Sequence, residues 1–403
     1  MALLRNFPAL AERGVRRYML GQAASVLGFW VQAITLNLLL WDGTHSPAAL
    51  GLLNFLLYGP MLVVAPLFGG RIKPQNSRDT VLRILACTLA VSAALLAASL
   101  LGMLTPAAIL VASLALGVLS AMETPARQLM LTSSLEDRSR LSNAVAMNTV
   151  VFNVGRMAGP AVAAVIYSHA GPTAAIGCSF VGILTMRFCV QGIETRRIEV
   201  KAAGGLRGAL QFARGDEFAR RYLPVITCMG LFVGTYQTLI PVLAAQQFGN
   251  AAAYTGLFFS CAGAGSFVAA LLLSSRFALG PSALVWAPWI SVAALAGVAA
   301  SLWPAMAVPC FVVIGFTLTF SSTSVNATLQ HRASDAVRGG VVGLYSMAFM
   351  GAMPIGHLLV GLLSSAIGPR HAFGVLACLM SLALVLQRLL QGPSSISNPR
   401  RSP

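Results

Sequence analysis

Twelve long apolar runs constrain this chain more than any other feature. They cover residues 18–41, 47–70, 84–104, 106–131, 143–167, 172–191, 222–246, 251–275, 282–303, 304–328, 339–363 and 369–387. A bilayer core roughly 30 Å thick needs about 20 helical residues to cross it. A spanning β-barrel would instead show short runs in which apolar and polar residues alternate. The runs therefore predict an all-α membrane protein with twelve transmembrane helices.

The composition and the placement of charge agree with a membrane protein. Hydrophobic residues make up 57% of the chain and charged residues only 9%, whereas soluble domains carry about 25% charged residues. Of the 27 Lys and Arg residues, 23 fall in tails or loops on one side of the expected spans, and only Arg370 falls on the other. Cytoplasmic loops collect Lys and Arg, so we expect both termini in the cytoplasm. The net charge of +16 then reflects topology, and we expect no nucleic-acid partner.

The sequence offers no catalytic or metal-binding constellation. All seven cysteines fall inside apolar runs without a CxxC pair, so we interpret them as small buried hydrophobes. No nucleotide-binding G-x-x-x-x-G-K-[ST] motif is present. The apolar runs contain no paired carboxylates and no set of a nucleophile and a base. We therefore expect neither an enzyme nor an ATP-driven pump, and no metal or cofactor.

The longest polar segment suggests how the chain divides. Residues 192–221 separate the sixth span from the seventh. We therefore expect an N-terminal six-helix bundle over 1–191, a cytoplasmic linker over 192–221, and a C-terminal six-helix bundle over 222–403.

An internal repeat supports this division. Phe152 matches Phe349 and Gly159 matches Gly356, both at a spacing of 197 residues. Two parallel six-helix repeats about an axis along the membrane normal form the major facilitator fold. That fold predicts a substrate path between the halves and alternating access by rocking of one half against the other.

Charged residues inside the spans are the first candidates for function. Glu123 lies four residues before Arg127, which places both on one helical face in the favourable order for an ion pair. Arg156 lies near the middle of the fifth span, where a charge costs about 3 kcal/mol unless a partner or a wet cavity compensates it. We expect Glu123, Arg127 and Arg156 to form one cluster. In one interpretation Glu123 exchanges a proton while the arginines receive an anionic or polar substrate. In the other, the three residues form a structural lock on the cytoplasmic side.

The fifth span also carries a pattern of small residues. Gly155, Gly159 and Pro160 allow close helix approach and a bend, and packing alone would explain them. Together with Ala146, their spacing resembles the antiporter signature of major facilitator exporters, although alanine replaces glycine at three positions. This resemblance implies export by exchange.

A wider resemblance rests on five segments. They read LGQAASVLGFWVQAI (20–34), METPARQ (122–128), LSNAVAMNTVVFNVGRMAGPA (141–161), YTGLFFSCAGAGSF (254–267) and RGGVVGLYSMAFMGAMPIG (338–356). They resemble the branch of the major facilitator superfamily that contains the bacterial enterobactin exporter. The resemblance implies a proton-driven exporter of siderophores or drug-like compounds in the bacterial inner membrane.

One loop departs from that family. The loop between the second and third spans has Lys73 where the family carries an acid. The resemblance then implies an altered cytoplasmic charge latch, which would use Arg78, Asp79 and Glu123 instead.

Other polar residues within spans are candidates for a cavity wall, although each is more commonly a helix–helix hydrogen bond. The main candidates are Gln32, Asn37, Tyr58, Asn148, Asn153, Tyr236, Gln237, Asn326 and Tyr345, with Gln22, Ser25 and Asn54 as further ones. His357 could titrate, but a neutral, hydrogen-bonded core histidine is the commoner state.

Three functions remain open from the sequence. The first is a secondary exporter of a small molecule by proton antiport, with a siderophore as the best candidate. The second is multidrug efflux, which usually uses an aromatic pocket, whereas aromatic residues make up only 8% of this chain. The third is a signalling or scaffold protein on a transporter fold. The expected partners are the substrate, protons and the lipid bilayer, and we expect a monomer.

Overall fold

The computed structural model describes residues 8–69, 72, 74–195, 206–274, 281–334 and 337–391. Within these ranges the chain is helical and no strand occurs. The longer elements are α2 (Arg13–Thr44), α3 (Pro47–Tyr58), α4 (Pro60–Gly69), α5 (Ser77–Leu100), α6 (Pro106–Ser133), α7 (Leu141–Gln191), α8 (Leu206–Gly215), α9 (Glu217–Cys228), the π-helical η4 (Met229–Val233), α10 (Tyr236–Gln246), α11 (Ala251–Ser274), α12 (Pro281–Ala300), α13 (Pro304–Arg332), α14 (Arg338–Phe349) and α15 (Ala352–Gln391). Three short 3₁₀ turns complete the described elements: η1 (Pro8–Ala11), η2 (Pro74–Asn76) and η3 (Arg138–Arg140).

Ten helical segments of the described chain are long and apolar enough to cross a membrane. Two of them, Leu141–Gln191 and Arg338–Leu390, have 51 and 53 residues, or about 75–80 Å of helix, more than twice the bilayer core. Each contains one glycine that leaves the helical conformation, Gly171 at φ 80° and Gly368 at φ 81°. If the chain reverses at these glycines, the ten segments make twelve crossings, which is compatible with the expected number.

Gly171 and Gly368, both with positive φ, lie at equivalent positions of the internal repeat. Each is a glycine followed by a proline, Gly171-Pro172 and Gly368-Pro369, and 368 − 171 gives the same spacing of 197. Proline fits the first turn of the helix that follows, because its fixed φ is already helical and its missing N–H would have no partner there. The repeat found in the spans therefore extends to the turns between them.

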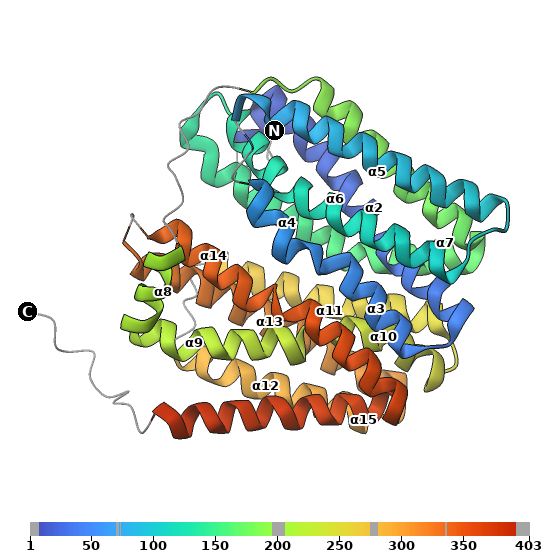
Figure 1. Ribbon diagram of the computed structural model, residues 1–403, viewed down its shortest axis with the longest axis vertical. Coiled ribbons are helices and arrows are strands. Elements are labelled where there is room, and N and C mark those ends of the chain that lie inside the picture. Colours follow the sequence, from blue (N-terminus) through green and yellow to red (C-terminus); the bar gives the residue numbers. More distant parts are fainter. Residues whose placement is uncertain are drawn as a thin grey trace, which may run out of the picture.

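The helices form two groups, as Figure 1 shows. In the first, α2 packs along α7, while α5 and α6 complete the layer. In the second, α13 packs against α11 and α12, and α15 packs against α12 and η4. The expected boundary at 192–221 stays a prediction, and residues 196–205 lie outside the described chain. Within the rest of that segment the chain is largely helical, because α8 and the start of α9 lie there and pack on each other and on α14.

The two groups meet through small residues. A Cβ on Gly361 of α15 would lie 2.7 Å from the Cα of Gly51 of α3, and a Cβ on Gly256 of α11 would lie 3.1 Å from the carbonyl oxygen of Pro160 of α7. Small residues let membrane helices approach closely where bulkier side chains would hold them apart. The α3–α15 and α7–α11 crossings therefore form the principal contacts between the groups.

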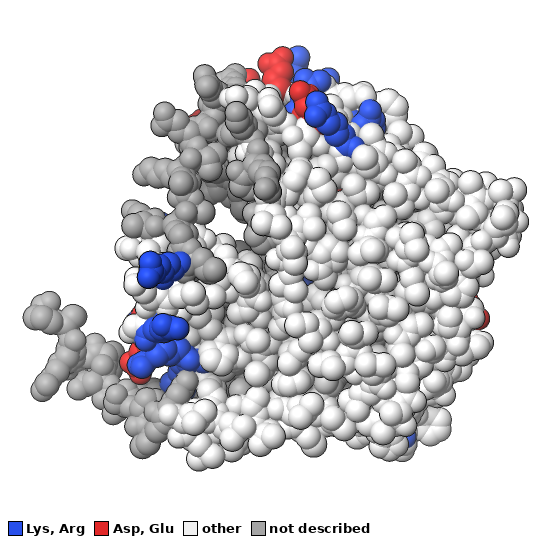
Figure 2. All heavy atoms as spheres, viewed as in Figure 1, with Lys and Arg blue, Asp and Glu red and all other residues white. Residues whose placement is uncertain are grey.

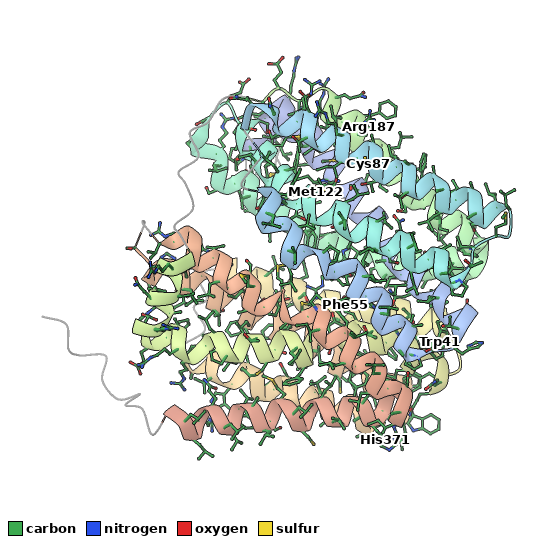
Figure 3. The ribbon with its side chains drawn as sticks, viewed as in Figure 1. Trp41, Phe55, Cys87, Met122, Arg187 and His371 are labelled. Atoms are coloured by element: carbon green, nitrogen blue, oxygen red, sulfur yellow. The ribbon has the colours of Figure 1, made fainter. Side chains whose placement is uncertain are left out.

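The groups are in contact at one end and diverge at the other. In Figure 1 they separate toward the end that carries α8 and the start of α14, and α14 packs on α8, α9 and α13 of its own group. In Figure 3, Trp41 and His371 mark the opposite end, and Phe55 of α3 lies where the groups meet. On the face drawn in Figure 2, most charged spheres lie at the upper and left edges, and the broad surface between them is uncharged. This distribution agrees with a lipid-facing belt.

The reversal at Gly171 gives a test of the fold. Its φ of 80° and ψ of 174° belong to a region that only glycine adopts freely, so Gly171→Ala is expected to lower the free energy of unfolding by about 1–3 kcal/mol. Gly177→Ala is the matched control, because Gly177 is helical and an added Cβ would meet nothing closer than 4.0 Å. Thermal unfolding of both variants in detergent measures the difference. Equal melting temperatures of the two variants would contradict the positive φ at Gly171.

Candidate transport pathway

Glu123 and Arg127 form an ion pair on α6. Arg127 Nη2 lies 2.5 Å from Glu123 Oε1, and the side chains are only 12% and 15% exposed. The helix places them one turn apart on the same face, as the four-residue spacing predicts. The same guanidinium donates from Nη1 to Gln22 Oε1 at 2.7 Å and from Nη2 to Ser25 Oγ at 2.8 Å, both on α2. Arg127 is therefore held by neutral and charged acceptors within the first group.

A cavity adjoins this pair. Its volume is about 60 Å³, and it is lined by side chains of α2, α3, α5, α6 and α7, including Gln32, Thr88, Ser120, Glu123 and Arg127. Glu123 Oε1 accepts the hydrogen bond from Arg127, while no residue in the described chain donates to Oε2. The carboxylate therefore has one oxygen available to a proton or a ligand.

Arg156 lies apart from the Glu123–Arg127 pair. Its Nη2 donates to the Tyr236 hydroxyl at 3.3 Å, which joins α7 to α10 in the other group. Tyr58 of α3 is also near Arg156. Among the described residues no carboxylate forms an ion pair with Arg156. The structure thus separates the expected three-residue cluster, because Glu123 is bound by Arg127 on its own helix while Arg156 projects toward the second group.

A second set of polar side chains joins the two groups. Asn54 Nδ2 of α3 donates to Asn37 Oδ1 of α2 at 3.0 Å and to Thr238 Oγ1 of α10 at 3.1 Å. Thr238 Oγ1 lies 2.8 Å from His357 Nδ1 of α15, and the His357 ring stacks on Tyr58 with centroids 5.7 Å apart. We call these five residues the inter-group network. Thr238 and His357 are fully buried, whereas Tyr58 is half-buried.

Four of the five network residues were candidates from the sequence, and one was not. Asn37, Tyr58, Asn54 and His357 are polar residues within spans and were candidates. Thr238 was not, because threonine is ordinary in membrane helices; its only signal is that it follows Tyr236 and Gln237 directly.

Two other candidates join helices within one group. Gln32 accepts from Ser179 at 2.7 Å and donates to Ser92 at 3.4 Å, which connects α2 to α7 and α5. Tyr345 donates to the Ser322 carbonyl oxygen at 2.8 Å. These are helix–helix hydrogen bonds, although Gln32 also borders the cavity beside Glu123.

The remaining candidates have local partners or none. Asn153 donates to the carbonyl oxygen of Thr149, one turn earlier, and Asn326 accepts from Gln330 on its own helix. Asn148 Oδ1 is buried without a hydrogen-bond partner. Gln237 is 7% exposed and lies beside the network on α10. Asn148 and Gln237 therefore remain the candidates with unused hydrogen-bonding capacity.

The small residues of the fifth span pack against α2. A Cβ on Gly155 would lie 2.5 Å from Val26 Cγ1, and one on Gly159 would lie 2.5 Å from Trp30 Cβ. Pro160 is accommodated within α7, whose one non-helical residue is Gly171. The glycines provide the expected close approach, while the expected bend at Gly159-Pro160 is not a break in the helix here.

Arg17 of α2 and Arg78 of α5 bind the C-terminal end of α7 and make no described bond to the second group. Arg78 Nη2 donates to the Gln191 carbonyl oxygen at 2.9 Å, and Arg17 Nη1 donates to the Gly192 carbonyl oxygen at 2.7 Å. Cations at the last carbonyls of a helix satisfy unpaired acceptors and complement its dipole. With Glu123 held by Arg127, the latch expected from Arg78, Asp79 and Glu123 is not formed between the described residues. Lys73 lies outside them.

The pair on α6 can be tested by a double-mutant cycle. Removing one partner of a buried ion pair leaves an uncompensated charge and costs about 3–5 kcal/mol. We expect Glu123→Gln and Arg127→Gln each to lower the melting temperature, and the double variant to be more stable than the sum of the two effects implies. Thermal unfolding of the four proteins in detergent measures the coupling. Additive effects would show that the pair does not contribute as a unit.

Comparisons with known proteins agree with this architecture. The sequence profile of a family described as transmembrane secretion effector matches residues 6–399. The staphyloferrin A transporter of Staphylococcus aureus is 25% identical over 374 residues, which cover 87% of this chain and 89% of that protein.

Two solved transporters share the fold. A bacterial homologue of the human lysosomal transporter Spinster, inward-facing and unoccupied, has a TM-score of 0.71 and 15% identity, covering 94% of this chain and 98% of its own. A bacterial homologue of the iron transporter ferroportin, also inward-facing, has a TM-score of 0.70 and 11% identity, covering 93% and 98%.

These findings establish the class of the protein. The likeness to solved transporters confirms the all-α membrane architecture and the major facilitator fold. The family and the relatives are transporters and not enzymes, which favours transport over the signalling or scaffold alternative. Because the profile spans nearly the whole sequence, this chain belongs to the transmembrane secretion effector family of major facilitator transporters.

Proposed function

We propose that this transporter exports an anionic or polar small molecule, with a siderophore as the best candidate, in exchange for protons. Export takes place across the bacterial inner membrane, with both termini in the cytoplasm, and the working unit is a monomer. The family description names secretion, and the relative from Staphylococcus aureus is named for a siderophore. The positive-inside distribution of Lys and Arg supports the orientation.

Arg156 carries the proposal for the substrate. It is a half-buried cation at the contact between the two groups, and its polar partner is the neutral Tyr236 hydroxyl. A charge in that environment costs several kcal/mol unless it is compensated. An anionic group of a substrate would provide the compensation, because charge-assisted hydrogen bonds to guanidinium are about twice as strong as neutral ones. Iron-free siderophores that carry carboxylates or phenolates have this chemistry.

The arrangement of the helices supports loading from the cytoplasm. The groups touch through α3, α10 and α15 and diverge toward α8 and α14. The second end is the one that the charge pattern predicts to be cytoplasmic. A molecule made in the cell would enter there, reach Arg156, and leave when the groups rock to expose the other end.

Glu123 is our proposed proton carrier. It faces the cavity in the first group and keeps one oxygen free of protein donors. Proton uptake requires its ion pair with Arg127 to open during the cycle, because a nearby guanidinium favours the ionised acid. The alternative role is a structural lock, in which the pair stays closed throughout.

Export can be tested by mass spectrometry of iron-starved cultures. In a deletion strain we expect a secreted chelator to disappear from the medium and to accumulate inside the cells. The intact gene should restore secretion, and Arg156→Gln should not, because the cation that binds the anionic group is gone. Unchanged secretion in the deletion strain would contradict siderophore export and direct the search to drug-sensitivity panels.

Proton coupling can be tested in inverted membrane vesicles, whose cytoplasmic face is outward, with the chelator identified in this way supplied outside them. Glu123→Gln is expected to lower transport driven by a pH gradient by about tenfold, within the usual range for coupling between two sites. Exchange of labelled for unlabelled substrate without a gradient should continue. Glu217→Gln is the matched control, because Glu217 is exposed in the first turn of α9. If Glu123→Gln leaves gradient-driven transport intact, the pair is a lock and the acid is not the carrier.

A further inference from the structure

We propose that His357 is a proton-binding site within the contact that seals the two groups, and that its protonation opens this seal. The inference rests on alternating access, which is part of the proposed function. It adds a second titrating residue, in the opposite helix group from Glu123.

The seal lies at the end remote from α8. The Ala48 backbone N–H donates to Ser365 Oγ at 3.0 Å, which joins α3 to α15. Two turns earlier on α15, His357 is fully buried and its carbonyl oxygen would lie 2.7 Å from a Cβ on Gly51. His357 is therefore enclosed by the surfaces that must part when this end opens.

His357 has one side-chain hydrogen-bond partner in the described chain. Thr238 Oγ1 accepts from Asn54 Nδ2 and lies 2.8 Å from His357 Nδ1. A hydroxyl group has one donor and two acceptor sites, so this contact forms with either neutral tautomer of the ring. His357 Nε2 is buried without a hydrogen-bond partner. The closed network therefore satisfies only one of the two ring nitrogens.

A protonated ring is poorly accommodated in the same network. Imidazolium has two N–H donors and no acceptor. The N–H on Nδ1 can donate to Thr238, but the N–H on Nε2 has no acceptor in the described structure. The new charge would also be buried, which is costly unless a counter-charge is present. Parting of the groups would admit water and relieve both costs.

The charged and titratable groups near His357 do not supply a counter-charge. From α3 the ring faces Tyr58, and beyond Tyr58 lie Arg156 of α7 and Tyr236 of α10. The other ionisable residues in the described part of α15 are Arg370, His371, Cys378 and Arg388. All four lie beyond Gly368, where the chain leaves the helical conformation.

The other helices packed on α15 add no acid beside His357. α12 has no ionisable residue, and α14 offers Arg338 and Tyr345, the latter bonded to Ser322. The charged residues of α9 lie at 217–221, about 25 Å of helix or more before Thr238, and its other titratable residues are Tyr222 and Cys228. No carboxylate of the described chain forms an ion pair with His357, so protonation there would not be neutralised in the closed state.

An irregular segment beside His357 provides a place for movement. Gly356 precedes His357, and a Cβ on it would lie 2.2 Å from the carbonyl oxygen of Leu231 within η4. π-helical turns inside longer helices occur frequently at functional sites and interrupt the regular ladder. The π-helical η4 lies immediately before α10, which carries Thr238. The chain can therefore bend at η4 while α10 keeps its regular hydrogen bonds.

Spin-label distances across the seal test the inference without measuring transport. Leu101 and Leu302 are 71% and 60% exposed, and lie after α5 in one group and after α12 in the other. Both would be replaced by labelled cysteine in a protein without its native cysteines. Double electron–electron resonance then compares samples between about pH 8 and about pH 5.5, a range that spans histidine titration. We expect a longer distance to become populated at low pH.

His357→Gln should abolish that response. Glutamine can accept from Thr238 through its amide oxygen but gains no proton in this range. His371→Gln is the matched control, because His371 is exposed on the same helix and bonds to its own Ile367 carbonyl oxygen. It should keep the full response.

The outcomes separate this inference from the export proposal. A pH-independent distance in the parent protein, or a response retained by His357→Gln, would overturn the role of His357 whether or not the chain exports a chelator. A normal response with unchanged chelator secretion would instead overturn siderophore export alone. If His357→Gln does not fold, His357→Asn decides in the same measurement, because asparagine also gains no proton in this range and a retained response would contradict the role of His357.

Discussion

A polar group inside a bilayer has no water to bond with, and this constraint orders the polar side chains of the molecule. The three arginines within the spans meet it to different degrees. Arg127 bonds to Glu123, Gln22 and Ser25, and Arg187 donates to the Leu82 carbonyl oxygen at 2.5 Å. Arg156 has the Tyr236 hydroxyl at 3.3 Å. Since each uncompensated charge costs about 3 kcal/mol or more, the arginine with the weakest protein partner is the one for which an external anion would make the largest difference.

The same constraint explains where the strong and the weak interactions lie. The one ion pair within the spans of the described chain joins residues of a single helix in the first group. Between the groups the described side-chain hydrogen bonds are few, such as Asn54 to Thr238 and Arg156 to Tyr236. Hydrogen bonds between membrane helices average only about 0.6 kcal/mol. The contact between the groups is therefore weak enough to open and re-form, whereas an ion pair across it would hold one state. The Glu123–Arg127 pair lies within one helix and therefore does not connect the two groups.

The sequence predicted features that depend on local spacing. Apolar run lengths located the spans, and the four-residue spacing of Glu123 and Arg127 predicted their contact, because helix geometry alone fixes it. The partner of Arg156 was not predictable in this way. It depends on the depth and rotation of α7 relative to α10, which lie 80 residues apart in the chain. Glu123 was expected to pair with Arg156 because it is the one acid within the predicted spans. Its partner is instead Arg127, one turn away on the same helix.

The repeat shows a further limit of local spacing. The spacing of 197 residues relates Gly171-Pro172 to Gly368-Pro369, and the structure makes both pairs reversal points with nearly equal φ. Backbone geometry is thus shared by the halves, but chemistry is not. Glu123 and Arg127 have no ionisable counterparts in α13, and His357 has Pro160 at the matching position. Titratable residues have been placed in each half independently of the repeat, one beside a cavity within the first group and one within the seal between the groups. In the major facilitator fold the symmetric halves supply the two alternating states, and under our proposals the asymmetry of these side chains would let protons favour one of them.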